Sequence, residues 1–316
     1  MNKPRIVLWI THKTVSEWHL NAAQVATFAA AVPQAEVVYC QTEEDFLAAL
    51  PGAQVALVWR FRQEWFALAP ELRFLGTPAA GQEYLNVKPP PAVELAFGAF
   101  HGAIMAETVL ALMLGLARGV IPFARAMQLP QGVIWPRESF SGTTRRLAGA
   151  SVTVLGFGKI GQWVGKLAKP FGVRLTGIRR RASTVLPDFC EPGDRVLGLD
   201  SLDSALPETD YLVLALPGTE ETTGLLDARR LALLPRHAAV INVGRGNAID
   251  EAALAEALRE GRLSAAALDV FATEPLPDDS PLRAIPNCFL YPHSSAIAPD
   301  YLDLYLAEMA AELSIE

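Results

Sequence analysis

A Gly-x-Gly-x-x-Gly sequence joins an apolar, β-branched run to the start of an amphipathic helix. The run is Val152 to Leu155, and the glycines stand at 156, 158 and 161. In this setting Gly156 allows a tight turn, Gly158 lets the backbone approach a pyrophosphate, and Gly161 lets the helix pack closely on the strand. The positive N-terminus of the helix then holds the anion. The sequence therefore predicts a dinucleotide site, because strand, turn and helix follow in the required order; the alternative is a glycine-rich turn without a ligand.

The next strand-like run, residues 173–178, ends in three arginines. They are Arg179, Arg180 and Arg181. An NAD-binding unit normally carries Asp or Glu at this place for the ribose diol, and such a carboxylate would repel a 2′-phosphate. Guanidinium groups bind a phosphate through paired, charge-assisted hydrogen bonds. The run therefore predicts NADP(H) in preference to NAD(H), with Arg179 as the first phosphate ligand and Arg180 as the second; a solvated basic loop is the alternative.

The composition is that of a globular protein with no polyanionic partner. The 316 residues, 51% of them hydrophobic, leave room for two domains of about 150 residues each. A net charge of −7 and a pI near 5.4 disfavour a nucleic-acid or membrane-surface role. No uninterrupted apolar segment reaches the roughly 20 residues that span a bilayer, and the chain runs from Met1 straight into a strand-like segment. The expected compartment is the cytoplasm.

The three cysteines predict neither a disulfide framework nor a zinc site. Cys40, Cys190 and Cys288 have spacings that fit neither pattern. We expect reduced, mostly buried thiols, and we expect no metal.

Apolar runs alternate with helical patterns along the whole chain, which predicts an α/β fold. The strands expected in the first half are residues 5–10, 35–40, 54–59 and 72–75, with a helix over 17–32. The strands expected after Gly149 are residues 151–155, 173–178, 211–215, 239–243 and 265–269.

A long apolar helical segment, Gly102 to Gln128, separates the two series of strands. A Gly/Pro/Ser-rich arm follows from Leu129 to Thr144, which would serve as an interdomain linker or an oligomer contact. A last helical segment, Pro299 to Leu313, is expected to return to the first domain, so that the chain crosses between domains twice.

Three further clusters each follow an expected strand, where ligands bind in open α/β sheets. They are Asn242-Val243-Gly244-Arg245-Gly246, the segment Leu268 to Pro277, and Pro286-Asn287 with Tyr291 to Ala296. In this order, and with the glycine motif upstream, they resemble the D-isomer-specific 2-hydroxyacid dehydrogenase family. The resemblance runs from about Leu72 to the C-terminus and is strongest between Leu147 and His293.

The resemblance implies two Rossmann-like domains with doubly wound parallel sheets and an active-site cleft between them. A substrate-binding, flavodoxin-like domain would comprise residues 1–99 and 294–316. The dinucleotide-binding domain would comprise residues 100–293.

The resemblance also implies three catalytic residues whose own chemistry suits the roles. The fork of Arg245 would bind the carboxylate and carbonyl oxygen of a 2-keto acid. The imidazole of His293 would give a proton to that oxygen in reduction and remove it in oxidation. Glu274 would hydrogen-bond the ring, favour its protonated form and so extend reduction to higher pH. Taken singly, each residue has an ordinary alternative: a surface charge, a turn carboxylate or a packed histidine.

Cofactor contacts follow from the same resemblance. Asp269 would meet the nicotinamide carboxamide, and the segment Leu216 to Thr219 would lie along the cofactor. The residues expected at the cofactor are Gly156, Gly158, Lys159, Ile160, Gly161, Arg179, Arg180, Leu216, Pro217, Thr222, Val243, Gly244, Asp269 and Ser295.

On the substrate side the match is partial. Gly81 lies where the family has a Gly-x-Asp loop, but the acid here is Glu83. Arg60 and Arg62 follow an expected strand, and each would favour an anionic substrate group or be a surface charge; His101 would contact substrate, cap or pack. The substrate contacts expected are Arg60, Gly81, Arg245 and His293.

Together these features predict an NADPH-preferring reductase that converts a small 2-keto acid of the glyoxylate/hydroxypyruvate class to the D-2-hydroxy acid. Dehydrogenation of another small anion is an alternative: formate dehydrogenases of this superfamily depart from the Glu-His pair, whereas phosphite dehydrogenases keep it. A non-catalytic, dinucleotide-sensing corepressor is another. A homodimer is expected because members of the family are usually dimers. The sequence leaves open which 2-keto acid is reduced and in which direction the reaction runs.

Overall fold

The computed structural model describes residues 3–127, 138 and 141–313, and the chain divides into two compact units. The first unit is Met1–His101 with Ile297–Glu316, and the second is Gly102–Ala296. The boundaries expected from the sequence, after 99 and before 294, lie close to these. The chain leaves the first unit once and returns to it, so it passes between the units twice.

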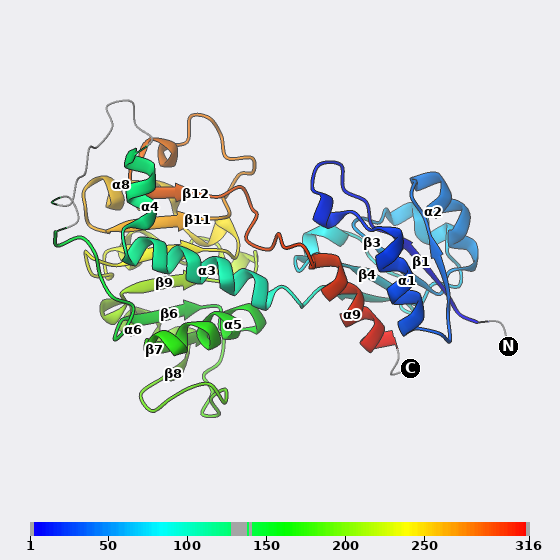
Figure 1. Cartoon of the computed structure of the whole chain (residues 1–316), viewed down its shortest axis with the longest axis horizontal. Helices are drawn as coiled ribbons and strands as arrows, with labels where there is room; N and C mark the ends of the chain where they lie inside the picture. The colour runs from blue at the N-terminus through cyan, green and yellow to red at the C-terminus, as the bar shows by residue number, and fades with distance from the viewer. Residues whose placement is uncertain (1–2, 128–137, 139–140, 314–316) are drawn as a thin grey trace. The chain divides into compact units, whose positions relative to one another are not determined.

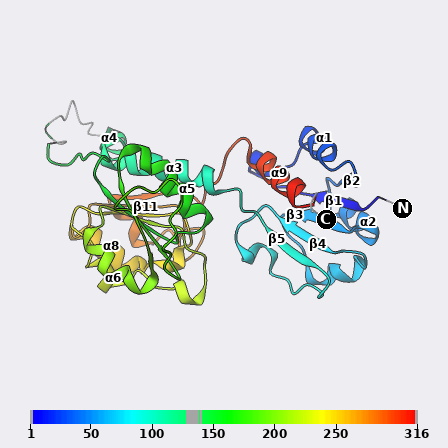
Figure 2. The same cartoon turned by 90° about the horizontal axis from the view of Figure 1, so that it is seen from below.

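The second unit is built on a seven-stranded sheet whose strands all pair in parallel. In spatial order the strands are β12 (Cys288–Leu290), β11 (Ala265–Leu268), β10 (Ala239–Asn242), β9 (Tyr211–Leu214), β6 (Ser151–Leu155), β7 (Arg174–Arg179) and β8 (Arg195–Gly198). Figure 2 shows helices α3 (Gly102–Ala117) and α5 (Lys159–Ala168) on one face, with α6 (Leu202–Ala205) and α8 (Glu251–Arg259) on the other. This is the doubly wound arrangement that the sequence predicted.

Both faces of this sheet are buried, which explains why its strands are apolar without interruption. Val154 and Val213 pack in the cluster under α3 and α5, whereas their neighbours Leu155 and Leu214 pack in the cluster on the opposite face. Side chains alternate between the faces of a strand, so a sheet covered on both sides needs apolar residues at every position.

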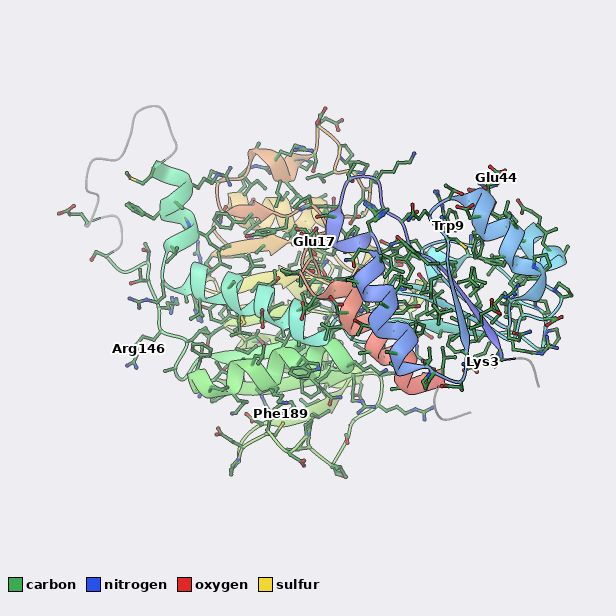
Figure 3. All side chains as sticks on the ribbon, turned by 45° about the vertical axis from the view of Figure 1, so that its right-hand side comes forward. Lys3, Trp9, Glu17, Glu44, Arg146 and Phe189 are labelled. Carbon is green, nitrogen blue, oxygen red and sulfur yellow. The ribbon has the colours of Figure 1, made fainter. Side chains whose placement is uncertain are left out.

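The first unit contains a five-stranded parallel sheet. Its spatial order is β2 (Glu36–Tyr39), β1 (Arg5–Trp9), β3 (Val55–Val58), β4 (Phe74–Thr77) and β5 (Glu94–Phe97). Helices α1 (Ala22–Ala31) and α9 (Tyr301–Leu313) lie side by side (Figure 1). Trp9, labelled in Figure 3, is buried and stacks on Phe46 of α2 (Glu43–Ala49) with 5.1 Å between ring centroids.

The chain passes from β1 outward to β2 on one side of the sheet and then continues from β3 to β4 and β5 on the other side. The strand order therefore reverses between β1 and β3. Ligands of open α/β sheets bind at the carboxyl ends of the strands at such a switch point. The loops after β1 and β3 are therefore the ligand-facing loops of the first unit.

Two expected helices were wrong in their extent. The helix expected over 17–32 begins only at Ala22, because Asn21 and Gln24 form a capping box in which each side chain accepts from the other's backbone N–H, at 3.0 and 3.2 Å. The helix expected over 102–128 is two helices, α3 and α4 (Val120–Met127), separated where Gly119 adopts a left-handed φ of 69°. The expected arm from Leu129 to Thr144 lies outside the described residues, except for 138 and 141–144.

No helix in the described part of the chain has the length and hydrophobicity that crossing a bilayer requires.

Candidate active site

The functional residues expected in the second unit all lie at the carboxyl ends of its parallel strands. Because all strands are parallel, the loops that follow them meet at their carboxyl ends. These loops contain residues 156–158 after β6, 180–181 after β7, 215–222 after β9, 243–250 after β10, 269–274 after β11 and 291–296 after β12.

The glycine turn after β6 has the shape that a pyrophosphate needs. Gly156 has φ 97°, and a Cβ there would lie 2.5 Å from the carbonyl oxygen of Ala215, so only glycine fits. Gly158 is the N-cap of α5; no side chain caps that helix, and no atom lies within 4 Å of where a Cβ would stand. The first turn of α5 therefore offers backbone N–H groups and a positive dipole end beside open space, which fits the dinucleotide.

Cations stand where a ribose-binding carboxylate would stand in an NAD site. Arg179 is the last residue of β7 and is exposed. Arg180 is also exposed, and its Nη2 lies 2.5 Å from Oε2 of Glu221. Among the described residues, no carboxylate pairs with Arg179 or Arg181.

The loop after β9 is closed by one buried hydroxyl. Thr222 Oγ1 donates to the carbonyl oxygen of Pro217 at 2.7 Å and accepts from the backbone N–H of Thr219 at 3.0 Å. The hydroxyl of Thr222 thus shapes the loop that presents Leu216 and Pro217, and its contact with the cofactor stays a prediction.

Asn242 closes the loop that carries Arg245. Its Nδ2 donates to the carbonyl oxygen of Arg245 at 3.0 Å, and its Oδ1 accepts from the backbone N–H of Gly244 at 3.0 Å. Arg245 Nη1 in turn donates to the carbonyl oxygen of Gly244 at 2.7 Å. Sequence reasoning assigned no role to Asn242, although an Asn at a strand end before Gly-Arg-Gly is a signal for such a turn.

The Arg245 loop rests directly on the loop after β11. A Cβ on Gly246 would lie 1.8 Å from the carbonyl carbon of Phe271, so the two backbones touch only because residue 246 is glycine. Glu251, the first residue of α8, accepts from the N–H of Ala272 at 2.7 Å, and Glu274 Oε1 accepts from the N–H of Phe271 at 2.9 Å. These contacts fix the segment that carries Glu274.

Glu274 and His293 form the central pair of the site. His293 Nδ1 lies 2.7 Å from Glu274 Oε2, and the two side chains are 37% and 35% exposed. An ionised carboxylate only accepts hydrogen bonds, so Nδ1 carries a proton and donates it. Among the described residues, no hydrogen bond reaches the other ring nitrogen, Nε2.

The backbone of His293 is held in an unfavourable conformation. Its φ of 53° lies in the left-handed region, which few non-glycine residues adopt. The N–H of His293 donates to the carbonyl oxygen of Asp269 at 2.8 Å, and the carboxylate of Asp269 accepts from the N–H groups of Ser294 at 2.7 Å and Ser295 at 3.0 Å. Asp269, which is 1% exposed, therefore aims the histidine. Its expected contact with a nicotinamide stays a prediction.

The substrate residues expected in the first unit follow neighbouring strands. Arg60 follows β3 and lies 5.7 Å over the ring of Trp9, and no carboxylate of the described chain pairs with it. Arg62 is engaged, because its Nη2 lies 3.1 Å from Glu43 Oε1. Gly81 follows β4 and precedes a 3₁₀ turn over Gln82–Leu85.

His101 packs inside the first unit. It is buried, its ring stacks on Phe100 at 4.0 Å, and its Nε2 lies 3.0 Å from the hydroxyl of Tyr301. These are the contacts of a packed side chain, and a contact of His101 with substrate stays one of the alternatives.

The buried cysteines are protonated at neutral pH. Burial raises the pKa of Cys288 to about 12, with Arg125 opposing and Glu251 adding to the shift. Burial, assisted by the charge of Asp45, raises the pKa of Cys40 to about 11. Neither thiol is an activated nucleophile. Residues 3–127, 138 and 141–313 contain no group of three or more His, Cys, Asp or Glu side chains that would hold a metal ion.

The segment that contains these loops matches a known protein family. Residues 110–295 match the family model for the D-isomer specific 2-hydroxyacid dehydrogenase, NAD binding domain. The chain is 33% identical over 273 residues to a D-3-phosphoglycerate dehydrogenase of Methanocaldococcus jannaschii, a match that covers 84% of this chain and 50% of that protein. It is 31% identical over 301 residues to glyoxylate/hydroxypyruvate reductase B of Yersinia pestis, covering 92% of this chain and 87% of that protein.

The fold is shared with a solved structure over nearly its whole length. A D-isomer specific 2-hydroxyacid dehydrogenase from Xanthobacter autotrophicus Py2, solved with NADPH and MES, has a TM-score of 0.78 and 29% identity, with 99% of this chain and 95% of that chain covered. The chain spans about half the length of the phosphoglycerate dehydrogenases that it matches. The loops at the carboxyl edge, the matched residues and the shared fold together establish that the chain belongs to the D-isomer specific 2-hydroxyacid dehydrogenase family.

Proposed function

We propose that this chain reduces a small 2-keto acid of the glyoxylate/hydroxypyruvate class to the D-2-hydroxy acid, with NADPH preferred over NADH. The observation that carries the proposal is the contact between His293 Nδ1 and Glu274 Oε2 at 2.7 Å. The loop that contains Glu274 also touches the backbone of the Arg245 loop. The similarity to the Yersinia pestis glyoxylate/hydroxypyruvate reductase B supports the substrate class. The D configuration is carried over from the family.

The dinucleotide has a matching place in the second unit. When bound, the nicotinamide supplies a hydride to the substrate carbon. The first turn of α5 beyond Gly158 holds the pyrophosphate through backbone N–H groups, and Arg179 binds the 2′-phosphate.

The residues of the chain supply the remaining chemistry. Arg245 binds the carboxylate and the neighbouring carbonyl oxygen, so it orients the substrate and offsets the negative charge that grows on that oxygen. As the hydride reaches C2, His293 transfers the proton of Nε2 to the oxygen, which gives the hydroxyl and leaves a neutral imidazole. Solvent then returns the proton to the ring. Glu274 keeps the ring oriented and stabilises its positive charge before transfer.

A second candidate substrate class carries a phosphate. The similarity to D-3-phosphoglycerate dehydrogenases favours this class. Arg60 favours it too, because it lies in the loop after β3, where the strand order of the first sheet reverses, and no carboxylate of the described chain pairs with it. Arg62 is less suited because Glu43 already neutralises it.

Initial rates of cofactor oxidation test the function directly. Glyoxylate, hydroxypyruvate, 3-phosphohydroxypyruvate, pyruvate and a bulkier 2-keto acid are each assayed with NADPH and with NADH. Fast turnover of glyoxylate or hydroxypyruvate with NADPH supports the proposal, and preference for the phosphorylated acid selects the second candidate. Tight NADPH binding with no turnover of any acid contradicts both and indicates oxidation of another anion or a sensing role.

Exchange of Arg179 for aspartate tests the cofactor preference. We expect Arg179→Asp to lower the ratio of NADPH to NADH efficiency (kcat/KM) by about tenfold, because a charge-assisted contact to the 2′-phosphate becomes a repulsion. Arg181→Asp is the matched control, since it makes the same charge change two positions beyond the strand end, and its ratio should move far less. An unchanged ratio in Arg179→Asp removes this residue from the role.

Exchange of Glu274 for glutamine tests the orienting pair. Gln keeps an acceptor for Nδ1 but loses the charge that stabilises the protonated ring, so we expect Glu274→Gln to lower kcat by about tenfold. NADPH affinity in a fluorescence titration should stay the same. Asp278→Asn, at an exposed carboxylate of the same segment, is the control. Wild-type kcat in Glu274→Gln speaks against the pair.

The homodimer and the cytoplasmic location stay predictions, as does the joint action of Arg60 and Gly81 with Arg245 and His293.

A further inference from the structure

The Arg180–Glu221 ion pair links the two loops that border the glycine turn. Strands β7 and β9 are the two neighbours of β6 in the sheet, and Arg180 and Glu221 belong to the loops that follow them. Arg180 Nη2 and Glu221 Oε2 lie 2.5 Å apart. An ion pair between these loops therefore spans the carboxyl end of β6, where the glycine turn begins.

The backbone of the turn contacts both bordering segments. The N–H groups of Gly156 and Phe157 both donate to the carbonyl oxygen of Ile178, at 2.9 Å, two residues before Arg180. On the other side, Gly156 lies against the carbonyl of Ala215, at the start of the loop that leads to Glu221. Both partners of the ion pair are thus anchored beside the site that we assign to the dinucleotide.

Arg179 and Arg180, the two candidate ligands of the 2′-phosphate, differ in whether a carboxylate already pairs with them. Among the described residues no carboxylate pairs with Arg179, whereas Arg180 already has an anionic partner. The Arg180 and Glu221 side chains are 77% and 68% exposed, so water and salt screen the pair and it exchanges readily for a stronger anion. A phosphate is such an anion, because it carries more negative charge than a carboxylate and also binds a guanidinium through two parallel hydrogen bonds.

We propose that Glu221 is a specificity-determining residue whose carboxylate occupies Arg180 in place of the 2′-phosphate when no dinucleotide is bound. Binding of NADPH to Arg180 then requires this arginine to release Glu221, so the ion pair competes with the 2′-phosphate. Glu221 thereby weakens NADPH binding and brings the affinities for NADPH and NADH closer together. The inference rests on the proposed function, in which Arg179 and Arg180 form the 2′-phosphate site.

Equilibrium titration of the whole chain with NADPH and with NADH, followed by nicotinamide fluorescence, tests this without turnover. We expect Glu221→Gln to lower the Kd for NADPH by about three- to tenfold, because it removes one competing charge, and to leave the Kd for NADH unchanged or higher. Glu220→Gln is the matched control: it is the exposed neighbour in the same 3₁₀ turn and makes no ion pair among the described residues. Its Kd values should stay within about twofold of wild type.

A double-mutant cycle shows whether Glu221 acts through Arg180. In an Arg180→Gln background the gain from Glu221→Gln should fall to the level of the Glu220→Gln control, because no guanidinium remains to be released. An equal gain in both backgrounds overturns the proposal, since Glu221 would then act only as a general negative charge. Raising the salt concentration should shrink the gain, because screening weakens the competition.

The outcomes separate this inference from the proposed cofactor preference. If wild type binds NADPH more tightly than NADH but Glu221→Gln changes neither Kd, only the role of Glu221 is overturned. If wild type binds NADH as tightly as NADPH and Glu221→Gln does not alter that, both the preference and the role of Glu221 are overturned. Selective tightening of NADPH in Glu221→Gln supports the proposal whatever the substrate proves to be.

Discussion

Replacement of His293 by alanine is expected to lower kcat for 2-keto acid reduction by about 10²-fold or more, the usual contribution of a positioned general acid. The variant loses the only proton donor that we assign to the carbonyl oxygen, so water must supply the proton from bulk. NADPH affinity should be retained, because the glycine turn and Arg179 lie on other loops. Single-turnover rates at saturating substrate, with the Kd for NADPH measured in parallel, separate the chemical step from binding.

A second histidine provides a matched control for this result. His237 also pairs with a carboxylate, since its Nε2 lies 2.5 Å from Asp210 Oδ1. Asp210 precedes β9 and His237 precedes β10, so this pair lies at the amino ends of the strands, away from the proposed site. His237→Ala should therefore keep wild-type turnover. If His293→Ala keeps it as well, another group protonates the carbonyl oxygen and the proposed mechanism is wrong.

Replacement of Arg245 by alanine is expected to lower kcat/KM for the 2-keto acid by about 10²- to 10³-fold, the cost of losing a preorganised donor to a developing oxyanion. Both KM and kcat should change, because the guanidinium binds the carboxylate in the ground state and stabilises the carbonyl oxygen in the transition state. Steady-state kinetics with glyoxylate and with hydroxypyruvate measure both terms.

Two variants show whether the geometry of Arg245 or only its charge matters. Arg245→Lys keeps the charge but cannot form the two parallel hydrogen bonds of a guanidinium, so it should recover only part of the loss. Arg236→Ala removes an exposed arginine just before β10, at the amino ends of the strands, and should leave the kinetics unchanged. Full activity of Arg245→Ala, with folding confirmed by circular dichroism, would contradict the assignment of this residue as the substrate anchor.

The strands that sequence patterns missed share one structural property. β5 and β8 were not expected, and the strand before Tyr291, which is β12, was expected without bounds; each of the three is an edge strand of its sheet. A central strand of a doubly wound sheet is covered on both faces and must be apolar, so periodicity reveals it. An edge strand pairs on one side only and tolerates short length and polar residues such as Glu94 and Arg195, so its signal is weak.

Local chemistry made part of the site predictable. The glycine turn, the arginines after β7 and the Arg245, Glu274 and His293 segments lie where a strand ends, and strand ends can be found from the sequence. Of the residues that hold these segments, Asn242 and Glu251 were missed, and Asp269 was expected only at the nicotinamide carboxamide. Asn242 acts on its own loop, but Glu251 reaches Ala272 across 21 positions and Asp269 reaches Ser294 across 25.

The sequence by itself determined the fold class, the family and the chemistry that its polar residues can perform, because these depend on local periodicity and on motifs within single loops. Tertiary structure alone decided which donors two other carboxylates meet: Asp269 meets the backbone N–H groups of Ser294 and Ser295, and Glu221 meets Arg180. These partners lie 25 to 41 positions apart. They meet because parallel strand pairing brings the carboxyl-end loops together, and sequence separation carries no information about that distance.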